Sequence, residues 1–218
     1  MGRPTPGDGL WIRHDLLAAI EPVAAGRCVA EAARSAVGRV ECNRPNRLVT
    51  LSHRQCLGAR GFGGESTGPN PTDRAKAGSK HHVVTDAQGI PLAVTLTGAN
   101  ANDVTQLLPV MDAIPPVRGK RGRPRRRPDQ VYADRGYDSQ PHRNALRERS
   151  IEPRIARRNT EHGSGLGVYR WVVERTLSWL HQFRRLRIRF ERRACIHQAF
   201  LSIGCALICW RWLQKSFC

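Results

Sequence analysis

Asp134 and Glu174 are the two residues of this sequence whose types and surroundings indicate chemistry. Asp134 directly follows Val131–Ala133, which we expect to form a short buried strand that ends in a tight turn at Gly136. A carboxylate at the C-terminal end of a strand in an open α/β sheet is well placed for catalysis. The alternative is that Asp134 only caps the turn after its strand, and spacing alone does not decide between the two.

Glu174 lies in a segment, residues 168–190, whose apolar residues recur with the period of one long helix. Polar residues recur at the same period and place this single carboxylate in the middle of a basic face: Arg170, Glu174, Ser178, His181 and Arg185. The alternative here is an ordinary helical ion pair between Arg170 and Glu174, worth about 0.3–0.5 kcal/mol.

Two carboxylates in these places are suited to a divalent metal ion. Cleavage and transfer of a phosphodiester require neutralised charge and an in-line nucleophile, and two ions about 3.5–4 Å apart supply both. Magnesium takes oxygen ligands and keeps several waters, so the protein needs to supply only a few carboxylates. We therefore expect Asp134 and Glu174 to be catalytic residues that ligate Mg²⁺ or Mn²⁺.

The charge of the chain points to a polyanionic partner. Lys and Arg number 36 against 18 Asp and Glu, which gives a formal net charge of +18. Nucleic acid fits better than a membrane surface, because the charge is not confined to one amphipathic helix. The densest run, residues 117–128, is either a phosphate contact or a solvated loop. The expected DNA contacts come from this run and from the basic helix face: Arg118, Lys120, Arg121, Arg123, Arg125, Arg126, Arg127, Arg170, His181 and Arg185.

The cysteine pattern indicates a reducing cytosol. Seven cysteines are scattered singly with no CxxC pair, which disfavours both a disulfide framework and a zinc site. We expect the last four to be small core residues. The N-terminus lacks a signal-peptide pattern. The apolar stretch 194–213 is interrupted by His197, Gln198 and Arg211, so we expect a buried helix and no membrane span.

The remaining pattern predicts an α/β fold, a mixed sheet with helices on its faces. Residues 81–85 and 90–96 are expected to be strands joined by the turn Asp86–Gly89. Further expected elements are a strand at 48–51, helices at 104–111 and 140–148, a strand at 151–156 and a last helix packed on the Glu174 helix. We assign residues 1–45 to a short helical or irregular N-terminal segment and residues 46–218 to one catalytic domain.

Five short blocks form a specific combination: TGPNPTDR at 67–74, GSKHHVVTD at 78–86, LTGAN at 96–100, YADRGYD at 132–138 and VERT at 173–176. Together they resemble the DDE transposases of bacterial insertion sequences. The resemblance covers about residues 65–213. It implies an RNase H-like core in which Asp134 is the second carboxylate, Glu174 the third, and Arg170 the arginine four residues before the family's glutamate.

The same resemblance implies metal-dependent cleavage and strand transfer at insertion-sequence ends. The implied partners are the transposon ends, target DNA and a possible homo-oligomer, with no membrane, in the cytoplasm beside the nucleoid. Two positions depart from the family's usual pattern. Gly167 stands where a tyrosine is common, and His181 stands where a lysine is common.

The larger departure is the first carboxylate, whose family position falls near residues 51–56. That stretch holds no Asp or Glu, and the third corner of the site is expected to present Ser52 or His53. Asp86 is a doubtful substitute because it belongs to the expected hairpin turn, and Asp73 is doubtful because it lies in a loop. Mg²⁺ should therefore bind weakly, and cleavage should be impaired.

An upstream frameshift restored near Gly61 would explain the missing acid. Codons 40–66, read in the other two frames, test this hypothesis, which fails if neither frame yields an Asp in a strand-like context. The alternative function is a non-catalytic, basic DNA-binding remnant of a transposase in which Asp134 and Glu174 are structural. Metal-dependent nicking of DNA separates the two.

Overall fold

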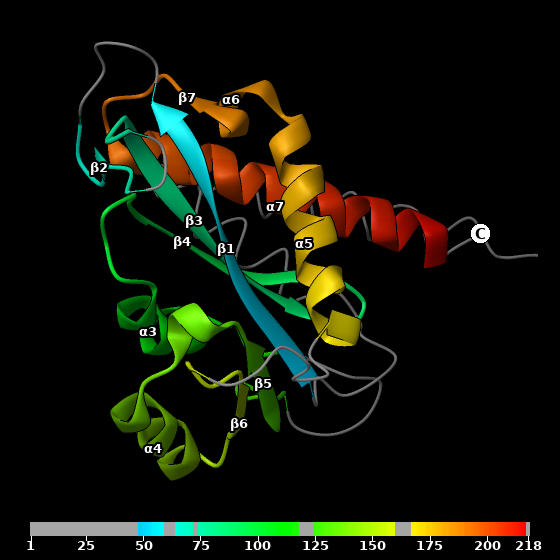
Figure 1. Ribbon diagram of the computed structural model, residues 1–218. Coiled ribbons are helices and arrows are strands. Elements are labelled where there is room, and N and C mark those ends of the chain that lie inside the picture. The colour runs from blue at the N-terminus through cyan, green and yellow to red at the C-terminus, as the bar shows by residue number, and fades with distance from the viewer. Residues whose placement is uncertain (1–47, 59–63, 72–73, 118–123, 160–166, 217–218) are drawn as a thin grey trace, which may run out of the picture.

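The computed structural model describes residues 48–58, 64–71, 74–117, 124–159 and 167–216 (Figure 1). The N-terminal segment expected at residues 1–45 lies outside these ranges. So do Asp73 and four members of the basic run, Arg118, Lys120, Arg121 and Arg123.

One mixed sheet forms the centre of the fold. Its strands are, in chain order, β1 (Leu48–Gly58), β2 (Gly68–Pro69), β3 (Ala77–Asp86), β4 (Pro91–Gly98), β5 (Gln130–Ala133), β6 (Glu152–Ile155) and β7 (Ile188–Arg189). Strands β4, β3 and β1 pair antiparallel, β5 pairs parallel with β1, and β6 pairs parallel with β5. An antiparallel meander followed by two parallel strands is the RNase H-like arrangement, so the predicted fold class is confirmed.

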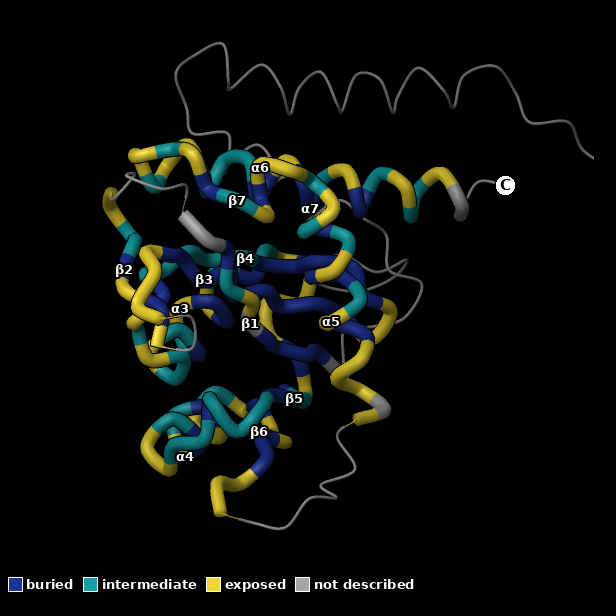
Figure 2. The backbone as a smooth tube through the Cα atoms, turned by 45° about the horizontal axis from the view of Figure 1, so that its top comes forward, coloured by how far each residue is buried: buried dark blue, intermediate teal, exposed yellow. Residues whose placement is uncertain are grey.

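Helices cover both faces of this sheet: η1 (Asp103–Gln106), α3 (Leu107–Asp112), η2 (Arg135–Tyr137), α4 (Gln140–Glu148), α5 (Gly167–Gln182), α6 (Arg184–Arg187) and α7 (Ala194–Ser216). One apolar cluster joins β1, β5 and β6 to α3 and α4, and a second joins β3 to α5, α6 and α7. Figure 2 shows the central strands buried along much of their length. The predicted strands, the hairpin and the helix at 140–148 are confirmed.

Strand β1 decides which side chains face α5. Val49 and Leu51 belong to the cluster with α3 and α4. Because neighbouring side chains on a strand point to opposite faces, the even-numbered residues of β1 face α5 and α7. Arg54 accordingly donates to Ser178 on α5, and Cys56 meets His197 on α7.

The single long helix predicted at 168–190 is wrong. Helix α5 ends at Gln182, Phe183 is extended, and the chain turns through α6 into β7. The reason is tertiary: Arg189 is buried and donates hydrogen bonds to five oxygens, four of them backbone carbonyls, on the segments 65–66, 79 and 191–192. These bonds override the helical period, and they remove Arg185 from the Glu174 stripe.

Helix α7 is the one helix, among the residues that the structure describes, with the length and apolar composition to cross a membrane, over Ala194–Gln214 at a mean hydropathy of 1.3. Its inner face packs on β4, α5 and α6 and buries Leu201, Cys205 and Ile208. The predicted packing on α5 is confirmed, and Trp212 joins that cluster. Of the last four cysteines, Cys205 and Cys209 are buried as predicted, Cys195 is exposed and the prediction is wrong there, and Cys218 lies outside the described residues.

Candidate functional site

Asp134 stands at the end of β5, as predicted, and its two carboxylate oxygens have different partners. Oδ1 accepts a hydrogen bond of 2.9 Å from the Gly136 amide and so caps the short helix η2. Oδ2 lies 3.8 Å from a guanidinium nitrogen of Arg170 on α5. Turn capping therefore accounts for only one oxygen, and the other is directed toward the helix that carries Glu174.

Gly136, two residues after Asp134, lets the side chain of Asp103 lie close to the turn. Among described residues, Gly89 in the β3–β4 turn is the glycine with a positive φ, at 90°, so the expected conformational reason does not apply to Gly136. A Cβ at Gly136 would lie 3.3 Å from Oδ2 of Asp103. Asp103 is itself fixed by a buried ion pair of 2.9 Å with Lys80.

Arg170 joins the two candidate acids. Its Nε donates a 3.0 Å hydrogen bond to Glu174 Oε1, while its Nη2 lies 3.8 Å from Asp134 Oδ2. The aromatic rings of Tyr132 and Tyr169, whose centroids are 4.3 Å apart, hold β5 against the first turn of α5. The fold thus brings two carboxylates 40 residues apart to one guanidinium, on a surface where Arg170 and Glu174 are exposed.

The third corner of the site belongs to β1. Leu51 pairs with Ala133, so continuing this parallel register by one residue sets Ser52 beside Asp134, on the face toward α5. Arg54, the next residue on that face, donates 3.2 Å to Ser178, one helical turn after Glu174. Strand β1 contains no Asp or Glu. Ser52 is the neutral group expected at this corner, Arg54 is a basic group that the sequence did not reveal, and the side chain of His53 lies outside the description.

Asp86 does not replace the missing acid. Its Oδ1 accepts hydrogen bonds from the amides of Gln88 and Ile90, which fixes the carboxylate inside the β3–β4 turn, as predicted. Asp86 pairs with Val49, three residues before Ser52, and so lies about 10 Å from that corner along the strands.

The donor set does not fit a pair of magnesium ions. Among the described residues, the corner holds two carboxylates, a guanidinium between them and a second guanidinium, that of Arg54, on the same face of β1 as Ser52. Magnesium requires oxygen ligands and repels cations, so Arg170 would have to leave before one ion could contact both acids.

The described residues of the basic run that are expected to contact DNA are exposed. Arg126 and Arg127 are exposed, and Arg125 is exposed but pairs with Asp129 at 3.2 Å. A backbone bridge between Val117 and Arg125 closes the base of the basic loop. These three side chains thus stand on the C-terminal side of the bridge that joins Val117 and Arg125.

His181 and Arg185 need correction as phosphate contacts. Burial, together with the nearby charges of Arg54 and Arg187, lowers the pKa of His181 to about 4, and its Nε2 is buried without a hydrogen-bond partner. The imidazole is therefore neutral at pH 7 and belongs to the interior. Arg185 is exposed, lies on α6 beyond the end of the helix that carries Glu174, and pairs with Glu191 at 2.9 Å.

A polar network beneath Asp134 was not identified from the sequence. His82 is fully buried, with Nδ1 3.0 Å from the Tyr137 hydroxyl and Nε2 2.8 Å from Thr97 Oγ1. Burial raises the pKa of Tyr137 well above its usual value. Together with the Lys80–Asp103 pair, this network supports the turn that carries Asp134. Two adjacent histidines inside an apolar strand were the available signal.

Comparison with known proteins shows where this chain has relatives. Residues 53–209 match a family described as "Transposase DDE domain". A Burkholderia cepacia protein named "Putative transposase for insertion sequence element IS402" is 62% identical over 203 residues, which are 93% of this chain and 96% of that protein. The alignment therefore includes most of the N-terminal segment.

More distant matches are partial. A Neisseria meningitidis serogroup B protein named "Transposase for insertion sequence element IS1106" is 30% identical over 129 residues, 55% of this chain and 40% of that protein. A chain in a simian T-cell lymphotropic virus intasome in complex with PP2A regulatory subunit B56 gamma has a TM-score of 0.43 and 14% identity. That match covers 76% of this chain and 49% of the other.

Proposed function

We propose that this chain, which belongs to the DDE transposase family, acts in DNA transposition through a site whose cleavage and strand-transfer activity is impaired. The observation that carries the proposal is the composition of the site. Asp134 and Glu174 meet at one guanidinium, and the strand that would complete an acidic triad supplies Ser52 and Arg54.

Asp134 and Glu174 would hold Mg²⁺ or Mn²⁺ in this proposal. A bound ion supplies charge neutralisation at the phosphate and activation of the attacking oxygen. The capping bond from Gly136 orients Asp134 so that Oδ2 faces α5. Glu174 is exposed and can turn toward the same place. The two acids and the two guanidinium groups sum to no net charge, so the site lacks the excess negative charge that would hold a divalent cation tightly.

A site without excess negative charge favours DNA binding over metal-dependent DNA chemistry. Arg170 and Arg54 bring positive charge to the place where a phosphodiester would lie, and Arg125–Arg127 add exposed positive charge before the start of β5, at the other end of the strand from Asp134. We propose transposon ends and target DNA as partners, self-association on DNA, and a cytoplasmic location beside the nucleoid. The non-catalytic remnant remains the second candidate, favoured by the same substitution at the third corner.

The alignment with the Burkholderia cepacia relative restricts the frameshift hypothesis. Because the 62% identical relative aligns with nearly the whole chain, a shift before Gly61 would have to be shared by both genes. Codons 40–66 of the two genes, read in all frames, test this directly.

The double variant Arg126→Ala/Arg127→Ala is expected to weaken DNA binding and to flatten its salt dependence. Each phosphate contact contributes about −0.9 to the slope of log K against log[salt], so losing two contacts reduces the slope by about 1.8. Fluorescence anisotropy of a labelled duplex at several salt concentrations measures it. The matched control is Arg192→Ala/Arg193→Ala, which removes two exposed charges near α7. Equal slopes for the parent and the Arg126/Arg127 variant would exclude this loop from the interface.

A further inference from the structure

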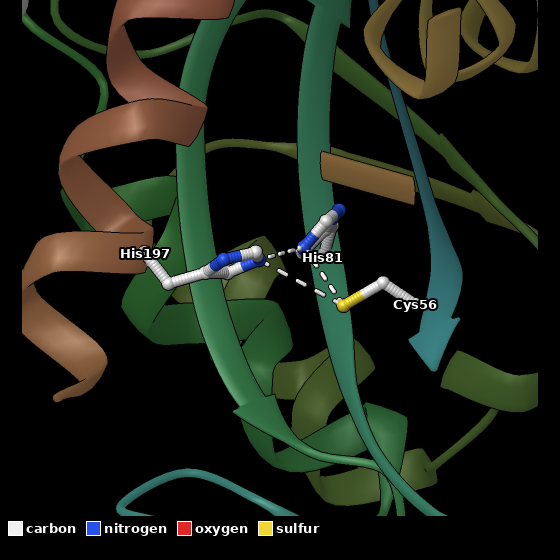
Figure 3. Close-up of side chains that lie close together, drawn as sticks. All are labelled: Cys56, His81 and His197. Carbon is white, nitrogen blue, oxygen red and sulfur yellow. Dashed lines mark hydrogen bonds between the residues drawn. The ribbon is translucent and has the colours of Figure 1, made fainter. Parts of the chain in front are cut away.

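A second cluster of metal-binding side chains lies on the same face of the sheet, away from Asp134. Cys56 of β1, His81 of β3 and His197 of α7 point toward one another in the interior (Figure 3). Their relative exposures are 1%, 0% and 0%. Cys56 follows Ser52 by four residues along β1, so the cluster lies about 13 Å from Ser52, the residue of β1 that stands beside Asp134.

The three donor atoms are spaced like the ligands of a small ion. Cys56 Sγ lies 3.3 Å from His81 Nε2 and 3.8 Å from His197 Nε2, and the two Nε2 atoms are 2.9 Å apart. Zinc binds sulfur at about 2.3 Å and imidazole nitrogen at about 2.0–2.1 Å, so tetrahedral ligands stand about 3.3–3.6 Å apart. The observed separations bracket this range, and shifts of a few tenths of an ångström would admit the ion.

A carboxylate orients one of these ligands. Nδ1 of His197 lies 3.0 Å from Glu191 Oε2, so the ring donates there and directs the lone pair of Nε2 toward the cluster. Metal-bound histidines are commonly held in this way. Glu191 is in turn fixed at 2.9 Å by Arg185, outside the cluster.

The other two ligands each have to give up or move a proton to take a metal. Nδ1 of His81 has no hydrogen-bond partner, whereas its Nε2 donates to His197 Nε2 across 2.9 Å, so binding moves the His81 proton from Nε2 to Nδ1. The buried thiol of Cys56 becomes a ligand when it gives up its proton. Zinc with one thiolate, and with the Glu191 carboxylate behind His197, then leaves no net charge among these groups, which matters in a site without solvent.

The chemistry of the donors selects the kind of metal. Sulfur and imidazole ligands suit zinc and disfavour magnesium, which requires oxygen. His181 supplies a further imidazole at the edge of the cluster, with its ring centroid 5.5 Å from that of His81 and its Nε2 buried without a partner. His181 lies outside the group of three donor atoms and would have to move to become a fourth ligand.

We propose that Cys56, His81 and His197 bind one Zn²⁺ ion that fastens α7 to strands β1 and β3. The site is structural, because its three ligands are buried and come from three elements that must pack together before they meet. Its ligands are 25 and 116 residues apart along the chain, which explains why the spacing of cysteines and histidines does not show it.

Metal titration of the full-length protein, prepared metal-free, tests the site. We expect one equivalent of Zn²⁺ to bind and to raise the thermal melting temperature. Co²⁺ in its place should show the visible bands of a tetrahedral site and a thiolate charge-transfer band in the near ultraviolet. Cys56→Ser should remove the charge-transfer band and lower Zn²⁺ affinity at least tenfold. The control Cys195→Ser changes an exposed cysteine of α7, the helix that carries His197. It should leave both the charge-transfer band and the Zn²⁺ affinity unchanged.

A second variant tests the site independently, in case Cys56→Ser does not fold. Glu191→Gln leaves every ligand in place and removes only the carboxylate behind His197, so Zn²⁺ affinity should fall about 10–100-fold. Asp134→Asn, at the acidic corner, should not change it. Absence of stoichiometric Zn²⁺ binding would overturn the proposal. So would binding that survives Cys56→Ser and Glu191→Gln undiminished, because the ion would then be held by cysteines elsewhere.

Discussion

Ser52→Asp is expected to give this protein a Mg²⁺-dependent DNA cleavage activity at least about 10²-fold above that of the parent chain, the usual effect of one electrostatic group in an active site. The register of β1 and β5 sets residue 52 beside Asp134 on the face toward α5. An aspartate there adds the third carboxylate and the negative charge that two divalent ions require.

The same variant should make folding depend on Mg²⁺. Ser52 is buried, so an aspartate beside Asp134 introduces a second negative charge that only a cation can compensate. We expect Ser52→Asp to melt at a lower temperature than the parent without metal and to regain stability as Mg²⁺ is added, whereas the parent should respond little. Differential scanning fluorimetry measures this beside the cleavage assay. Ser52→Asn is the matched neutral control, and an equal gain of cleavage in that variant would contradict the explanation.

Arg170→Gln is expected to raise the Mg²⁺ affinity of the parent site up to about tenfold. Arg170 forms ion pairs with both Asp134 and Glu174, and exposed pairs contribute about 0.2–1 kcal/mol each. Removing both pairs leaves two carboxylates without a cation, and a combined 1.4 kcal/mol corresponds to tenfold. Isothermal titration with Mg²⁺ measures the change.

Arg170→Lys separates charge from geometry in that experiment. Lysine keeps the positive charge between the acids, so Mg²⁺ affinity should stay near that of the parent. An equal rise in Arg170→Lys, or a fall in Arg170→Gln, would show that Arg170 does not compete with a metal ion. The DNA-binding salt slope should drop by about 0.9 in Arg170→Gln alone, because one phosphate contact is lost.

The sequence predicts the parts of this fold that carry local signals. The β3–β4 hairpin has strand-forming runs on both sides of the turn Asp86–Gly89, and α4 begins at Gln140 after Ser139, with Pro141 in its first turn. The placement of Asp134 at a strand end follows from the short apolar run before it. In each case the residues that determine the element lie inside it or directly beside it in the sequence.

The second half of strand β1 could not be predicted from the local sequence pattern. It contains Ser52, Arg54 and Gln55, which do not alternate with apolar residues, yet β3 pairs with it as far as Leu57. Pairing with a neighbouring strand formed this half of β1, and no local propensity indicated it. The break at Phe183 has the same origin, since Arg189 is held by groups more than 100 residues earlier.

The candidate site was predictable at two corners for the same reason. Asp134 and Glu174 belong to recognisable elements, and the pair between Arg170 and Glu174 follows from the helix period, whereas the contact of Arg170 with Asp134 depends on how α5 packs on β5. Arg54 beside Ser178 and the cluster of Cys56, His81 and His197 depend on long-range register and on the path of α7. Neither could be derived from spacing along the chain.

The most direct test is Mg²⁺-dependent cleavage of a labelled duplex that carries the ends of the insertion sequence, with the parent protein and Asp134→Asn compared at equal DNA occupancy. The account predicts that both proteins bind the duplex, that the parent cleaves it no faster than background, and that Asp134→Asn changes nothing further. Robust Mg²⁺-dependent cleavage by the parent that Asp134→Asn abolishes would contradict it, because two carboxylates would then suffice at this site.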